Sequence, residues 1–177
     1  CLIQEAHLSM TAYYNTGTVA VSAGGTTVTG TSTVWTSAMT STDGYKMKIA
    51  GNDNIYSFTY VSATSGTISP ALSGADNLSG KSYVIFRDEY SLASDFDRFL
   101  KNGSIYVYSG GRVQDTITEK PRDLWREEFS PEATDPIRRC LITRPHSTSG
   151  YKQVRLNPPP KTAKVYPYEY IQKVTPM

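Results

Sequence analysis

Apolar and polar residues alternate over several short stretches between residues 15 and 86, a pattern typical of β-strands with one face exposed to solvent. The clearest case is Gly17–Trp35, in which Val19 and Val21 share one face of a first strand. Ala23-Gly24-Gly25 then supplies the positive φ angles that a tight hairpin turn requires. The threonine-rich residues that follow form the returning strand, and Trp35 is expected to be the apolar anchor of this unit.

Other alternating stretches, bounded by Gly, Pro, Asn or Asp, also predict strands. They are Tyr45–Ile49, Ile55–Val61, Thr67–Ile68, Ser82–Phe86, Phe99–Lys101, Ser104–Tyr108, Arg112–Thr116, Ile137–Thr143, Tyr151–Leu156 and Lys164–Ile171. The Gly-, Ser- and Asp-rich residues from Pro70 to Gly80 are expected to form a loop. Pro167 lacks a backbone N–H, so it predicts that the last strand lies at a sheet edge or is kinked. Short strands at regular spacing favour a small barrel or sandwich.

The first fourteen residues have a different spacing, which predicts the end of a helix at residues 1–14. The residues at intervals of three and four are Ile3, Ala6, His7, Met10 and Tyr14. So short a helix is marginal alone and must pack on something, such as a partner chain. Since the chain begins at Cys1 within this pattern and ends at Pro176-Met177 just after a strand, we interpret it as part of a longer product, truncated at both ends.

A second, short helix is predicted near residues 119–129. Thr118 is its expected cap, Pro121 is tolerated in its first turn, and Trp125 and Phe129 contribute to its apolar side. The expected fold class is therefore mainly β (α+β). Its parts are a helix end belonging to a helical bundle (1–14), a β-rich insertion built as a small barrel or sandwich (15–86), and a second β-rich region (87–177).

Composition and charge narrow the function. The chain has 177 residues, is 38% hydrophobic and 19% charged, and carries a net charge of +2, which fits a folded protein without a polybasic block for nucleic acid or anionic lipid. It has no apolar run long enough to span a bilayer. Cys1 and Cys140 do not form a disulfide framework. Thirteen Tyr beside five Phe favour half-buried surfaces and interfaces between subunits.

Candidate catalytic and metal-binding residues have more ordinary explanations. His7 and His146 have no Cys or carboxylate at ligand spacing, so both are interpreted as structural. The acids Asp88, Glu89, Asp95 and Asp97 are interpreted as turn and cap residues, because a catalytic carboxylate pair needs a cleft. There is no G-x-S-x-G nucleophile motif and no phosphate-binding glycine loop. The sequence therefore predicts no catalytic, cofactor-binding or metal-binding residue and a protein that is not an enzyme.

This composition favours a surface that contacts other chains. The candidate interface residues are Ile3, Met10, Trp125, Phe129, Arg138 and Arg139. Trp125 and Phe129 fit an intramolecular core equally well. The two arginines, with Arg144, Lys152 and Arg155, form either a basic patch facing a partner or a solvated sheet face, the latter being the more common arrangement.

Several stretches, taken in order, form a family pattern. They are the hairpin GTVAVSAGGTTVTGTSTVW, the strand Lys81-Ser82-Tyr83-Val84-Ile85, the connector Asp88-Glu89-Tyr90-Ser91-Leu92-Ala93-Ser94-Asp95-Phe96, the strand end Val154-Arg155-Leu156-Asn157-Pro158-Pro159-Pro160, and Tyr166-Pro167-Tyr168-Glu169-Tyr170. This order resembles the head-to-tail adaptor (connector) proteins of tailed bacteriophages. In that family a helical bundle carries a β-rich insertion, and a Y-x-L-P-x-D-F connector and an L-x-P-x-P strand end recur. Ala93 stands where the family usually has proline.

The resemblance implies a structural protein of the virion neck, assembled in the host cytoplasm. It would form a ring of about twelve copies between the portal protein and a tail tube or nozzle protein. The ring would surround double-stranded DNA without sequence-specific binding, and near-neutral charge suits such a wall because phosphate contacts give DNA affinity. The GTTVTGT-type hairpin also occurs in other phage structural proteins, so a β-rich tail-fibre or receptor-binding module is the alternative. A tail-associated glycan hydrolase would need a carboxylate pair that the sequence does not specify.

Overall fold

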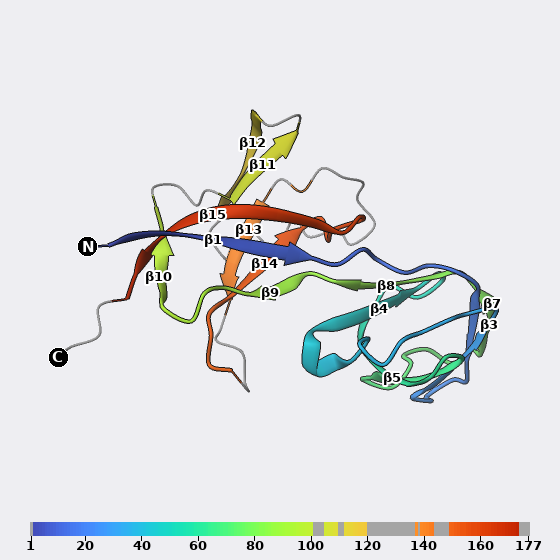
Figure 1. Cartoon of the computed structure of the whole chain (residues 1–177). Helices are drawn as coiled ribbons and strands as arrows, with labels where there is room; N and C mark the ends of the chain where they lie inside the picture. Colours follow the sequence, from blue (N-terminus) through green and yellow to red (C-terminus); the bar gives the residue numbers. More distant parts are fainter. Residues whose placement is uncertain are drawn as a thin grey trace. The chain divides into compact units, whose positions relative to one another are not determined.

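The structure is a computed structural model that describes residues 2–100, 105–109, 112–119, 137, 139–143 and 149–173. Strands dominate it (Figure 1). The chain divides into two compact units, in which unit 2 comprises Tyr13–Arg87 and unit 1 combines the residues on either side of it, Cys1–Ala12 and Asp88–Met177. The mainly β fold class, with a β-rich insertion and a second β-rich region, is confirmed. One sheet is curved into a near-closed barrel and the other into half a barrel.

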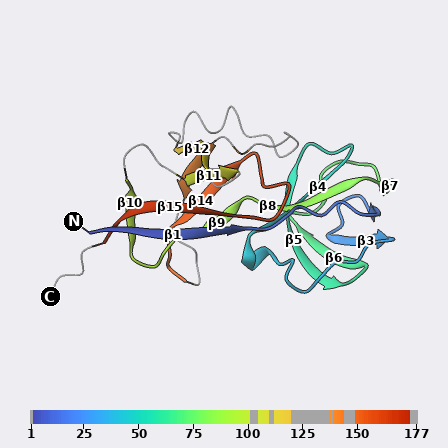
Figure 2. The ribbon, with the colours of Figure 1, turned by 45° about the horizontal axis from the view of Figure 1, so that its top comes forward.

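Unit 1 contains an eight-stranded sheet with the order β1-β15-β11-β12-β13-β14-β9, and β10 also pairs with β15. Its strands are β1 (Ile3–Met10), β9 (Glu89–Ser91), β10 (Phe96–Phe99), β11 (Ile105–Ser109), β12 (Arg112–Glu119), β13 (Arg139–Thr143), β14 (Gln153–Asn157) and β15 (Lys164–Gln172). All pairs are antiparallel except β12 with β13. The two longest-paired strands, β1 and β15, run alongside each other in Figure 2.

The predicted helix at residues 1–14 is wrong, because Ile3–Met10 is a strand. Helical spacing and strand alternation coexist in this segment, since Ala6, Leu8 and Met10 also follow each other with a period of two. In the structure Leu8 and Met10 are buried, and every residue of β1 has a partner in β15. Pairing with a distant strand satisfies the backbone and buries this face, which a helix of three turns cannot do alone.

The helix predicted near 119–129 lies outside the described residues except at its first residue. Glu119 is the last residue of β12 and pairs with Cys140, and Thr118 pairs with Arg139. Thr118 is therefore a strand residue, and its prediction as a helix cap is wrong. The β-branched residues of Arg112–Glu119 extend the strand beyond its predicted end at Thr116.

The proline in the last strand has a specific place in the sheet. β15 is an inner strand, between β1 and β11, so the prediction of an edge strand is wrong as stated. The carbonyl of Glu169 accepts a bond from Leu100, and the N–H of Lys173 donates to Asp95, so odd-numbered residues of β15 face away from β1. Pro167 faces the same way, where the ladder with β11 consists of a single pair at Tyr168. The absent N–H of Pro167 therefore falls at a position where the pairing with β11 ends.

Unit 2 contains a seven-stranded antiparallel sheet with the order β7-β2-β3-β6-β5-β4-β8. Its elements are β2 (Thr18–Val21), β3 (Thr27–Thr31), a 3-10 turn η1 (Ser41–Asp43), β4 (Tyr45–Ile49), β5 (Ile55–Ser62), β6 (Ser65–Ser69), β7 (Leu78–Lys81) and β8 (Tyr83–Arg87). The predicted hairpin at Gly17–Trp35 is confirmed, with Gly24 at φ +66° in its turn. The loop expected from Pro70 to Gly80 is shorter than predicted, because β7 begins at Leu78.

Trp35 is the anchor that the sequence predicts for unit 2, since it is 2% exposed. Its ring makes edge-on contacts with Phe58 and Tyr83 at centroid distances of 5.1 and 5.9 Å. Its indole Nε1 donates to the Tyr83 hydroxyl at 2.8 Å, and that hydroxyl donates to the carbonyl of Thr16 at 2.7 Å. The polar tips of two large side chains are thereby satisfied in the core. Burial raises the pKa of Tyr83, against the lowering effect of the Trp35 bond.

Candidate functional site

The connector that carries the family resemblance begins at a buried ion pair. The side chain of Asp88 is fully buried, and its Oδ2 lies 3.1 Å from Nε of Arg155 in β14. The same guanidinium pairs through Nη2 with Glu89, whose side chain is 23% exposed. The Asp88 contact is an ion pair without hydrogen-bond alignment at these atoms. A carboxylate without solvent needs a cation beside it, so this contact ties the connector to β14.

Backbone pairing reinforces this attachment. β9 pairs with β14 through Ser91 with Gln153, Tyr90 with Val154 and Glu89 with Arg155. The N–H of Leu156 donates to the carbonyl of Asp88 at 2.8 Å, and the N–H of Leu92 donates to the carbonyl of Lys152 at 2.8 Å. The connector and the Val154–Pro160 segment are thus neighbours in one sheet.

The other end of the connector holds β15. Tyr170 donates its hydroxyl hydrogen to Oδ1 of Asp95 at 2.7 Å, and the N–H of Ala93 donates to the Tyr168 hydroxyl at 2.8 Å. The ring of Phe96 stacks on that of Tyr170 at a centroid distance of 5.6 Å. A turn is present here as predicted, since the N–H of Phe96 donates to the carbonyl of Ala93 at 3.0 Å. Asp95, however, bonds to the neighbouring strand instead of capping a helical turn.

These surroundings raise the pKa values of the two tyrosine hydroxyls. Burial, with added effects of the bond to Asp95 and its charge, raises the pKa of Tyr170 to about 12. Burial also raises the pKa of Tyr168, against the lowering effect of the bond from the Ala93 backbone. Both hydroxyls therefore stay protonated at neutral pH, which fits hydrogen bonding within a core.

The acids of the connector have structural partners. Asp88 and Glu89 contact Arg155, Asp95 accepts from Tyr170, and Asp97 lies 3.7 Å from Nζ of Lys152. Of these acids Asp88 is fully buried, whereas the side chain of Asp97 is 42% exposed.

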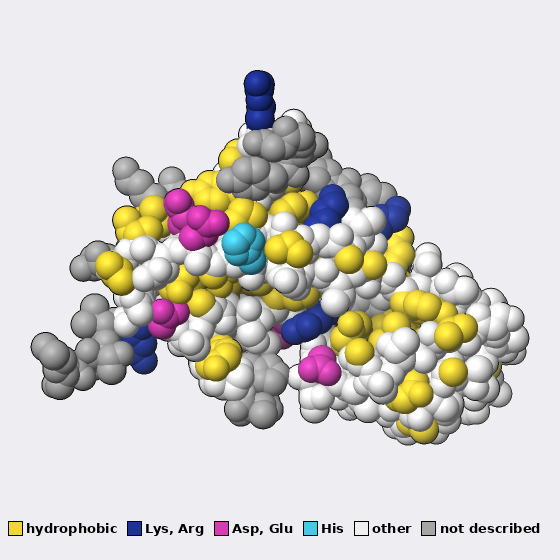
Figure 3. All heavy atoms as spheres, in the orientation of Figure 1, with side chains coloured by type: hydrophobic (Ala, Val, Ile, Leu, Met, Phe, Trp, Pro, Cys, Tyr) yellow, Lys and Arg dark blue, Asp and Glu magenta, His cyan; other side chains and the backbone are white. Residues whose placement is uncertain are grey.

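The same contacts pair part of the expected basic patch with acids. Of its members, Lys152 and Arg155 are engaged by acids. Arg139 lies half-buried in β13 opposite Asn157, while Arg138 and Arg144 lie outside the described residues. On the face drawn in Figure 3, Lys and Arg side chains lie in several separate groups, and Asp and Glu side chains are present on the same face.

The candidate interface residues are placed differently from one another. Ile3 is 56% exposed, whereas Met10 is 4% exposed in the core of unit 1 and packs within the chain. Trp125 and Phe129, like Arg138, lie outside the described residues. His7 is exposed beside Glu5, and His146 is not described.

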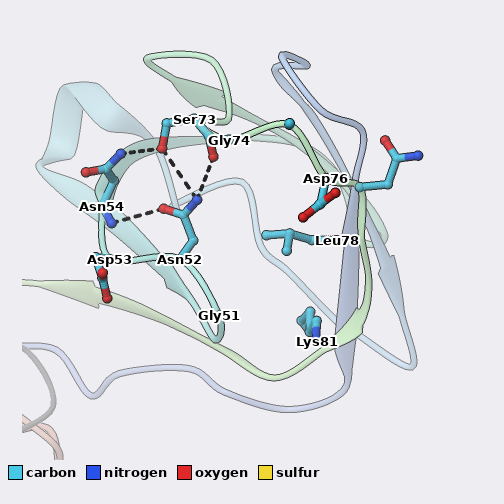
Figure 4. Close-up of a pocket in the computed structure, with 11 residues that line it drawn as sticks. Gly51, Asn52, Asp53, Asn54, Ser73, Gly74, Asp76, Leu78 and Lys81 are labelled. Atoms are coloured by element: carbon cyan, nitrogen blue, oxygen red, sulfur yellow. Dashed lines mark hydrogen bonds between the residues drawn. The ribbon is translucent and has the colours of Figure 1, made fainter.

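A pocket in unit 2 was not apparent from the sequence. Its volume is about 590 Å³, and it is lined by Gly51, Asn52, Asp53, Asn54, Ser73, Gly74, Ala75, Asp76, Asn77, Leu78 and Lys81 (Figure 4). Asn52 donates through Nδ2 to the carbonyl of Ser73 at 2.8 Å and accepts at Oδ1 from Tyr56, 2.8 Å away, and from the N–H of Asn54. These bonds join the turn after β4 to the loop before β7. No aromatic side chain lines this pocket.

Comparisons with protein-family models, with curated protein sequences and with solved structures found no match. Within the described ranges, no cluster of three or more His, Cys, Asp or Glu side chains is arranged to hold a metal ion. The described part of the chain contains no helix with the length and apolar character needed to cross a membrane.

The pairing of Asp88 with Arg155 is the feature of this site that sequence reasoning missed. Arg155 between Val154 and Leu156, and an acid directly after the strand that ends at Arg87, were the available signals, but a charged residue that alternates with buried ones is ordinary in a half-exposed strand. Which acid meets which base depends on strand order, and strand order is not visible in local periodicity.

Proposed function

We propose that this chain is a structural protein of a tailed-phage virion, a head-to-tail adaptor that forms a ring between the portal and the tail and surrounds the DNA channel. The observation that carries the proposal is that three of the five segments responsible for the resemblance lie in unit 1 and are joined there through the connector. The connector pairs with the Val154–Pro160 segment and bonds to the Tyr166–Tyr170 segment. Segments that contact one another are a stronger basis for a resemblance than separate short motifs.

The topology also supports the proposal. Unit 2 is inserted between β1 and β9 of unit 1, as the resemblance implies for its β-rich insertion. The helical bundle of that family has no counterpart at residues 3–10, so the proposal relies on the insertion and on the connector.

The mechanism in this proposal is assembly. A ring subunit offers two different surfaces that fit each other on neighbouring copies, and the closed ring makes weak single contacts collectively strong. The near-neutral net charge of +2 is compatible with a wall along which DNA moves, because attraction to phosphate requires an excess of positive charge.

The symmetry of the assembly tests the proposal. Electron microscopy of the purified chain, alone and mixed with portal rings from a tailed phage, is expected to show closed rings of about twelve copies that stack on the portal. A trimer would support the tail-fibre alternative instead. A chain that stays monomeric with and without portal would overturn the adaptor proposal.

A further inference from the structure

β1 is an end strand of its sheet with an open hydrogen-bonding edge. The N–H of Gln172 donates to the carbonyl of Leu2 at 3.0 Å, so even-numbered residues of this segment direct their backbone groups toward β15. The backbone groups of Ile3, Glu5 and His7 consequently point to the other side. In the part of the chain that the structure describes, no strand pairs with β1 on that side.

The other sheet ends carry features that discourage pairing with a further strand. β9 is three residues long, and β10, which pairs with β15 beside the main path of the sheet, has four residues and a break in register. β7 has four residues and includes Lys81 and Gly80, the latter at φ +60°. The free side of β8 is occupied at Ile85 by a bridge to Tyr14. β1 has eight residues, lacks Pro, Gly and Lys, and keeps an unbroken register with β15. Among these ends, β1 is therefore the one suited to accept another strand.

The side chains of the odd-numbered residues of β1 are exposed to solvent, and they include an acid and a histidine. Ile3 is 56% exposed, and the side chains of Glu5 and His7 are 63% and 61% exposed. Nε2 of His7 lies 3.9 Å from Oε1 of Glu5, so the two groups lie side by side on one face. Acidic, histidine and hydrophobic side chains gather on the face that carries β1 and β15 in Figure 3.

We propose that β1 pairs antiparallel with β1 of a second copy, with the two-fold axis at Ala6. The edge-facing residues are odd-numbered, so only registers that join odd to odd residues make hydrogen bonds. The register centred on Ala6 places Glu5 opposite the second copy's His7, and His7 opposite its Glu5. Centring on Glu5 or on His7 would instead place identical side chains opposite each other, which is unfavourable for two carboxylates.

β1 also approaches β9 of the same unit, and one residue beyond β1 the N–H of Thr11 bonds to the hydroxyl of Tyr90 at 3.3 Å. This pairing goes beyond the proposed function, because a ring closes through two different surfaces, whereas β1 with β1 is a two-fold contact that uses the same surface twice. Pairing at an open edge obtains its affinity from main-chain bonds and its register from side chains.

A charge-swap series tests the register. Glu5→Lys places a lysine opposite His7 of the second copy, and His7→Glu places two carboxylates opposite each other. Both side chains are exposed, so neither change should disturb the core. Sedimentation velocity over a concentration series is expected to show dimers of the wild-type chain, and dimerisation roughly tenfold or more weaker for each single variant. The double variant Glu5→Lys/His7→Glu, and an equimolar mixture of the two single variants, should both recover dimers.

Recovery in the mixture is the decisive result, because the lysine introduced at position 5 of one variant then faces the glutamate introduced at position 7 of the other. Dimerisation unchanged in both single variants, no recovery in the mixture, or no dimer in the wild-type chain would each overturn the β1 pairing. The copy number of any ring, counted by electron microscopy in the same single variants, is expected to be unchanged. Loss of rings would therefore bear on the proposed function, and loss of the two-fold contact on this inference.

Discussion

Arg155 is a side chain whose replacement should destabilise unit 1. It supplies the cation beside the fully buried carboxylate of Asp88, at 3.1 Å, and also contacts Glu89. Arg155→Met keeps most of the aliphatic length of the side chain and removes the charge. The Asp88 carboxylate then remains in the interior without its guanidinium. We expect the free energy of unfolding of unit 1 to fall for this reason.

The expected loss of unfolding free energy depends on how deeply the Asp88–Arg155 pair is buried. Removing one partner of a buried ion pair costs about 3–5 kcal/mol, and because the Arg155 side chain is 29% exposed we expect the lower end, about 3 kcal/mol. Asp88→Asn leaves Arg155 in contact with Glu89 and partly with solvent, so its cost should be about 1–2 kcal/mol. The double variant no longer contains an isolated buried charge. Its cost should therefore be smaller than the sum of the single costs by about 1–2 kcal/mol.

Urea unfolding followed by circular dichroism measures these costs, and hydrogen exchange locates them. Faster exchange is expected at β9 and β14, with little change in unit 2. The matched control is Glu89→Gln, which alters the half-buried second acid and should cost no more than about 1 kcal/mol. The role given to the ion pair is wrong if Arg155→Met costs no more than this control, or if the costs of the two single variants simply add in the double variant.

Two further predictions concern packing and pH. In Gly66→Ala the new Cβ would lie 2.4 Å from a ring carbon of Phe58, so we expect urea unfolding to show a loss of about 1–3 kcal/mol in the stability of unit 2. Adding Phe58→Leu to the same chain should recover part of this loss. Equal losses with and without Phe58→Leu would contradict the clash. The pKa of Tyr170 is raised from 10.0 to about 12 in the folded chain, so the unfolded state loses its proton first and the free energy of unfolding should fall as pH rises from 10 toward 12. Tyrosinate absorbance compared between the wild-type chain and Tyr170→Phe checks this, and equal titration of the two chains in that range would contradict it.

Much of unit 2 could be predicted because its signals are local. The strand predicted at Tyr45–Ile49 matches β4, in which Met47 and Ile49 are buried and Tyr45 is half-buried. Turn residues between short alternating stretches set strand ends within a few positions, since glycine and asparagine tolerate the backbone angles that turns need.

Unit 1 shows where local signals are insufficient. The spacing of Ile3–Met10 fits a helix as well as a strand, and the partner that makes it a strand, β15, is at the other end of the chain. The sequence did not indicate which residues contact the acids of the connector, because Arg155 and Tyr170 reach Asp88 and Asp95 only through strand order.

Local patterns in the amino-acid sequence were enough to establish that this chain folds mainly as short strands, where most of those strands lie, and that Trp35 anchors the insertion. The three-dimensional arrangement was needed to establish that the first segment is a strand paired with β15, and that the connector contacts both β14 and β15. This division arises because alternation specifies which face of a strand is buried, whereas the choice of neighbouring strand depends on contacts between residues far apart in the chain.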